Sequence, residues 1–70
     1  MVAYDYKAQR WVMGSDAAKL MIEQAREELE ASKSIKYRRL IGLHDTCINQ
    51  YEADRFAIID EATQYLKAVA

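Results

Sequence analysis

His44 and Cys47 are the only histidine and the only cysteine of the 70-residue chain, and they stand three positions apart. On a helix this spacing places both side chains on adjacent turns of one face, where imidazole nitrogen and thiolate sulfur are ligands that zinc accepts. A metal site needs three or four ligands, and the chain offers no second residue of either type. We therefore expect no bound metal and no cofactor, and a histidine that bonds a neighbour at a helix–helix interface. Two copies meeting on a symmetry axis would supply four ligands, and this alternative stays open.

Arg55 falls among apolar residues of the same predicted helix face, between Tyr51 and Ile59. An isolated buried charge is very costly, so the guanidinium needs a carboxylate partner. The partner is expected on the neighbouring helix or on another chain, and Glu28, beside the apolar stripe of the preceding predicted helix, is one candidate. The pattern predicts an ion pair that fixes the register of two helices, and the alternative is a site for an acidic ligand or partner.

One basic cluster surrounds an aromatic residue near the middle of the chain. Its cations could contact phosphates and its ring could stack on a base. The cluster consists of Lys33, Lys36, Tyr37, Arg38 and Arg39. Four glutamates between positions 23 and 30 would repel nucleic acid, so the pattern favours a solvated charged bend. Nucleic-acid binding through this cluster is kept as the weaker alternative.

Two segments carry apolar residues at helical spacing. The stripe of residues 15–32 is narrow and contains Ala18 and Ala25, which permit close approach of a partner helix. From 34 to 69 the stripe stays in register across Gly42, so the spacing predicts one helix of about 35 residues, near 50 Å long. Ser34 is its expected cap, and a kink at Gly42 is the competing interpretation. The short link between the segments predicts an antiparallel hairpin.

The N-terminal arm, residues 1–13, is ambiguous. Val2, Tyr4 and Tyr6 alternate with polar or small residues as in a strand, whereas Tyr4 and Trp11 also share a helical face. The absence of proline and the presence of only two glycines argue against a turn-rich β fold. The sequence therefore predicts an all-α fold: one domain, 1–70, in which two long helices form a helical hairpin that self-associates into a four-helix bundle.

Composition limits the partners. Ten Lys and Arg against eleven Asp and Glu give a net charge of −1, without the basic excess that nucleic-acid and membrane-surface binders show. A chain this short buries only about 60% of its unfolded surface, so we expect a homodimer. The predicted self-association interface consists of Tyr37, Ile41, His44, Ile48, Tyr51, Arg55, Ile58, Ile59, Ala62 and Leu66. Tyr4, Tyr6 and Trp11 are expected to contact a partner, because aromatic rings are common at interfaces.

These patterns predict a small regulatory interaction module that binds another protein or itself through apolar helix faces. We expect no enzyme and no catalytic residue, because the chain has neither a glycine-rich phosphate loop nor a metal-hydrolase motif. A small chaperone or antagonist of one specific protein is a further alternative. No apolar run reaches the roughly 18 residues of a membrane span, so a cytoplasmic protein without membrane contact is expected.

Overall fold

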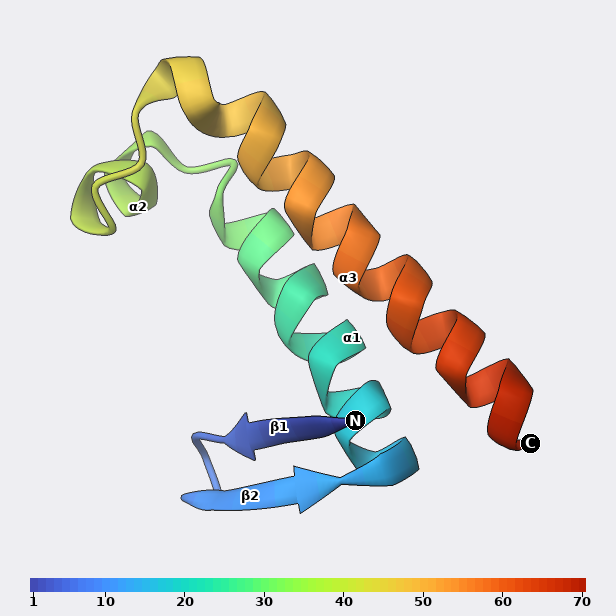
Figure 1. Ribbon diagram of the computed structural model, residues 1–70. Helices are drawn as coiled ribbons and strands as arrows, with labels where there is room; N and C mark the ends of the chain where they lie inside the picture. Colours follow the sequence, from blue (N-terminus) through green and yellow to red (C-terminus); the bar gives the residue numbers. More distant parts are fainter.

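The computed structural model describes all 70 residues. Strands β1 (Val2–Asp5) and β2 (Arg10–Met13) form an antiparallel hairpin that runs directly into helix α1 (Gly14–Ala31). A short helix α2 (Ile35–Leu40) and a 3₁₀ turn η1 (Asp45–Cys47) lead to the long helix α3 (Ile48–Val69). Figure 1 shows α1 and α3 side by side and antiparallel, with the hairpin at one end of α1 and α2 projecting at the other. No helix combines the length and apolar character needed to cross a membrane.

The all-α prediction is wrong, because the N-terminal arm is a β-hairpin and the fold is a small mixed α/β one. The extended alternative for this arm is the one the structure adopts. The hairpin turn contains no glycine. The Asp5 carboxylate accepts hydrogen bonds from the backbone N–H groups of Lys7 and Ala8, each at 3.1 Å, and Gln9 adopts the left-handed conformation with φ 54°. A glycine count therefore carries no information about this turn.

Gly14 joins the hairpin to α1. Its φ of +64° lets the chain turn from β2 into the helix without a loop, and its N–H donates to the Met1 carbonyl at 2.8 Å. Residues with a side chain rarely adopt this backbone conformation, whereas glycine adopts it freely.

Gly14→Ala is expected to lower the free energy of unfolding by about 1 kcal/mol, because alanine is strained at positive φ. The added methyl group meets only Tyr65 Oη at 3.8 Å, an ordinary contact, so the cost lies in the backbone. Urea denaturation measures the loss, with Ser15→Ala at the neighbouring exposed position as control. Equal stability of the two variants would contradict this account of Gly14.

The single helix predicted over 34–69 is also wrong, and with it the helical hairpin of two long helices and the four-helix bundle. Gly42, at φ +74°, ends α2 in a Schellman motif. The Leu43 N–H donates to the Arg38 carbonyl at 2.8 Å, and the Gly42 N–H donates to the Arg39 carbonyl at 3.2 Å. Ser34 caps a helix as expected, since its Oγ accepts from the Tyr37 N–H, but that helix is only six residues long.

The apolar stripe stays in phase because of the length of the break. Seven residues, 41–47, separate α2 from α3. Seven residues correspond to nearly two turns of an α-helix, so the stripe resumes within about 20° of its original phase. Periodicity alone therefore does not distinguish one long helix from two helices with this spacing.

The buried core consists of small side chains. Helices α1 and α3 approach each other where alanines offer no bulk, as the narrow stripe of 15–32 predicted. The buried residues are Ala3, Ala17, Ala18, Ala25, Ser32 and Ala62. No large apolar side chain is fully buried, which leaves most of the apolar surface only partly covered.

Candidate functional site

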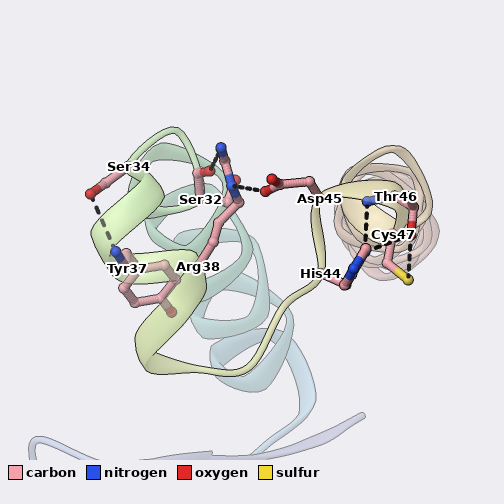
Figure 2. Close-up of polar contacts among 8 residues, drawn as sticks. All are labelled: Ser32, Ser34, Tyr37, Arg38, His44, Asp45, Thr46 and Cys47. Carbon is pink, nitrogen blue, oxygen red and sulfur yellow. Dashed lines mark hydrogen bonds and ion pairs between the residues drawn. The ribbon is translucent and has the colours of Figure 1, made fainter.

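The bend between α1 and α3 is held together by Arg38 (Figure 2). Its Nη1 donates to the Ser32 carbonyl at 2.8 Å, and its Nε lies 3.5 Å from Asp45 Oδ1. Ser32 is itself buried and donates from Oγ to the Leu29 carbonyl at 2.8 Å. Arg38 therefore links the end of α1 to the start of η1, so this cation has a structural role.

The structure divides the predicted basic cluster between different contacts. Lys33 pairs with Glu30 at 3.0 Å, Arg38 is engaged as above, and Tyr37 is half-buried. Lys36 and Arg39 are exposed and have no ion-pair partner. Two of the four predicted cations are therefore free to contact phosphate, which is a much smaller binding surface than the sequence suggested. Nucleic-acid binding at the bend stays a prediction.

His44 and Cys47 lie outside any α-helix, contrary to the expected helix face. His44 caps η1: its Nδ1 accepts from the Thr46 N–H at 3.2 Å and lies 2.8 Å from Thr46 Oγ1 (Figure 2). Cys47 is exposed, with its Sγ 3.9 Å from Thr46 Oγ1. The chain brings no three potential ligands together for a metal, so the pair on its own could supply only part of a site.

The second polar cluster joins α1 to α3 and confirms the predicted partner of Arg55. The Arg55 guanidinium forms an ion pair with Glu28 Oε2 and lies 4.5 Å from the centre of the Tyr51 ring. Tyr51 Oη donates to the same carboxylate oxygen at 3.3 Å. One acceptor on α1 thus holds two side chains one turn apart on α3, which fixes the register of the two helices.

Charge and burial shift two pKa values in this cluster. Burial alone lowers the pKa of Arg55, but the hydrogen bond and charge of Glu28 outweigh it and raise the pKa. Burial raises the pKa of Tyr51 above its ordinary value of 10.0, and the adjacent Glu28 carboxylate raises it further. Both raised pKa values extend to higher pH the range in which Tyr51 keeps its proton and Arg55 keeps its charge.

The raised pKa of Tyr51 predicts a loss of stability in alkali. The unfolded chain ionises this phenol near pH 10, whereas the folded chain holds the proton to higher pH. The stability that the protonated Tyr51 contributes is therefore fully present below pH 10, and it is lost as the pH rises through the raised pKa of Tyr51 in the folded chain. Urea denaturation between pH 8 and pH 11 measures it, and Tyr51→Phe is expected to make the alkaline loss smaller. An unchanged loss in that variant would contradict the assignment.

The predicted self-association residues are partly used inside the monomer. Ala62 is buried, and the half-buried members are Tyr37, Ile48, Tyr51, Arg55, Ile58, Ile59 and Leu66. Ile41 and His44 are exposed at the bend. Much of this stripe therefore faces α1 of the same chain, and its contact with a second chain stays a prediction.

The hairpin carries a surface that the sequence indicated only in part. Strand alternation places Tyr4 and Trp11 on one face as a cross-strand pair, and Val2 and Met13 as the next pair. Tyr4, Tyr6 and Trp11 were expected to contact a partner, but Val2 and Met13 were not singled out. The alternation of aromatic or apolar with polar or small residues in 2–6 indicated the first strand. No pattern in the sequence indicated that residues 10–13 form the second strand and pair with it.

Comparison of the chain with protein-family models, with curated proteins and with solved structures gave no match.

Proposed function

We propose that the chain is a non-catalytic interaction module that functions in association with another protein chain, a second copy in the first instance. The observation that carries this proposal is the exposed area. The folded chain exposes 5300 Å², whereas a compact monomer of 8.1 kDa exposes about 4,500 Å². The excess of about 800 Å² equals what one partner contributes to an interface of standard size.

The shape explains the excess. The molecule extends 38 × 25 × 14 Å, and its radius of gyration is 13.3 Å, against about 11 Å for a compact chain of this length. Its thinnest dimension is little more than the diameter of one helix. Stable domains bury apolar surface between at least two packed layers, and here the hairpin packs on only one end of α1 (Figure 1). A second chain supplies cover for the rest of the molecule.

The polar clusters support a non-catalytic role. Glu28, Tyr51 and Arg55 are engaged in holding α1 against α3, and Arg38 holds the bend. His44 is engaged in capping η1. Apart from the exposed Cys47, the side chains best suited to chemistry therefore have structural partners within the fold.

Sedimentation equilibrium at micromolar concentrations tests the proposal. The expected result is a mass of twice 8.1 kDa that falls toward the monomer value on dilution. A folded monomer at all concentrations would contradict self-association.

A further inference from the structure

The outer side of the β-hairpin is an exposed apolar surface, here called the hairpin face. It consists of Val2, Tyr4, Trp11 and Met13 on the strands and of Tyr6 at its edge, which also lines the hollow between the turn and α1. Four of these side chains are more than half exposed: Val2 by 57%, Tyr6 by 75%, Trp11 by 68% and Met13 by 71%. The opposite side of the sheet packs inward, with Ala3 buried and Val12 half-buried. The sheet is therefore covered on one side only.

The aromatic side chains of the hairpin face hold each other in place. The Tyr4 ring packs edge-to-face against Trp11 with centroids 5.2 Å apart, and against Tyr6 at 5.0 Å. The backbone of Tyr4 is also held in place, because the Gln24 side chain on α1 donates a hydrogen bond to the Tyr4 carbonyl oxygen at 3.1 Å. Rings that are already ordered lose less entropy on binding, so this surface is suited to a tight contact.

Charge around the hairpin face favours a protein surface as its occupant. Strand alternation places Asp5 and Arg10 on the other side of the sheet, so the hairpin face carries no charge. Lys7 in the turn lies 3.9 Å from Glu27 on α1. Glu23, Glu27 and Glu28 line the hollow between the turn and α1, which opposes nucleic acid and anionic lipid.

The absence of charge also favours contact between identical faces. Around a two-fold axis every residue meets the same set of residues from the second copy, so a charged patch repels itself. The largest other group of exposed apolar side chains, Ile35, Leu40 and Ile41 at the bend, lies among Lys36 and Arg39, so two such faces would bring like charges together. The hairpin face has no such penalty.

We propose that two copies of the chain pack hairpin face against hairpin face about a two-fold axis. This inference rests on the proposed function and names the surface through which the copies associate. The other side of each hairpin already packs against α1, so stacking the two sheets covers the side that is still exposed. The aromatic rings supply the interface centre, where rings of this kind dominate binding energy.

Trp11 is the only tryptophan, so its fluorescence reports on this face alone. Emission and acrylamide quenching are measured from nanomolar to high micromolar protein, alongside the mass by sedimentation. The expected result is a shift of the emission to shorter wavelength and a loss of quenching, both with the same midpoint as the doubling of mass.

Met13→Lys tests the surface by mutation, since it places one unpaired charge from each copy in the proposed apolar interface. Its dimer dissociation constant is expected to rise about tenfold or more, which corresponds to about 1.4 kcal/mol. Leu40→Lys, at the most exposed apolar side chain of the bend, is the matched control and is expected to leave dimerisation unchanged. Circular dichroism confirms that both variants fold.

The outcomes separate the two proposals. The hairpin-face contact is overturned if the protein dimerises while Trp11 remains fully quenchable. It is also overturned if Leu40→Lys dissociates the dimer and Met13→Lys does not. Either result leaves the proposed function standing. A monomer at every concentration overturns the hairpin-face contact and the self-association on which it rests. Protection of Trp11 only on addition of RNA or of lipid vesicles, without a change in mass of the protein alone, also overturns both.

Discussion

Replacing Ala62 by leucine is expected to destabilise the protein more than any other single change considered for the helices. Ala62 is fully buried on α3, and Ala18 and Ala25 are buried on the facing helix α1. Three extra carbon atoms at this seam push the helices apart, and overpacking of this kind costs about 1–3 kcal/mol. A core this small rarely supplies more than about 3–5 kcal/mol in total, so a large fraction of the chain is expected to unfold at 37 °C.

Ala57→Leu is the matched control, because Ala57 lies on the same helix and is exposed. The two residue types have nearly equal helix propensity, so this variant is expected to stay within about 0.5 kcal/mol of the wild type. Thermal and urea denaturation followed by circular dichroism compare the two. Equal stability of both leucine variants would show that α1 and α3 are not closely packed at Ala62.

Glu28→Ala is expected to have the second largest effect. It removes the acceptor of Arg55 and of Tyr51 at once, and Arg55 Nε already lacks a hydrogen-bond partner. Breaking a fully buried pair costs about 3–5 kcal/mol. Arg55 is 24% exposed and Glu28 is 38% exposed, so solvent reduces the expected loss to about 2 kcal/mol.

Glu30→Ala on the same helix is the control, because its pair with Lys33 is exposed on both sides. Such pairs contribute about 0–1 kcal/mol. A double-mutant cycle of Glu28→Ala with Arg55→Ala isolates the coupling between the two side chains. A coupling no larger than that of the Glu30–Lys33 pair would refute the assignment of Glu28 as the anchor between the helices.

The need of Arg55 for a carboxylate could be predicted from the sequence, with Glu28 as one candidate that the structure confirms, and the helix of 15–32 is present as α1, Gly14–Ala31. Both predictions rest on strong physical costs. A charge on an apolar helix face needs a partner, and an apolar stripe interrupted by small residues needs a facing helix. These requirements hold whatever the rest of the chain does.

The break between α2 and α3 could not be predicted from periodicity. It depends on the left-handed backbone at Gly42 and on a seven-residue spacing that restores the phase of the stripe. The turn of the hairpin was missed for a related reason. The Asp5 carboxylate accepts the backbone N–H groups of the turn, and Gln9 adopts the left-handed conformation that glycine or asparagine usually supplies. Neither feature can be recognised from the residue types alone.

The exposed half of the hairpin became recognisable only with the strand register. Two cross-strand pairs, Val2 with Met13 and Tyr4 with Trp11, assemble the hairpin face from two short segments on either side of the turn. Neither segment is long enough to indicate by itself which side is covered by α1.

The concentration dependence of thermal unfolding tests the central claim, that a second chain completes the fold, most directly. Mass action makes the unfolding midpoint of an associated protein rise with concentration, whereas that of a monomer is constant. The midpoint is expected to rise steadily over a hundredfold increase in concentration. A midpoint that stays the same over that range would contradict the claim.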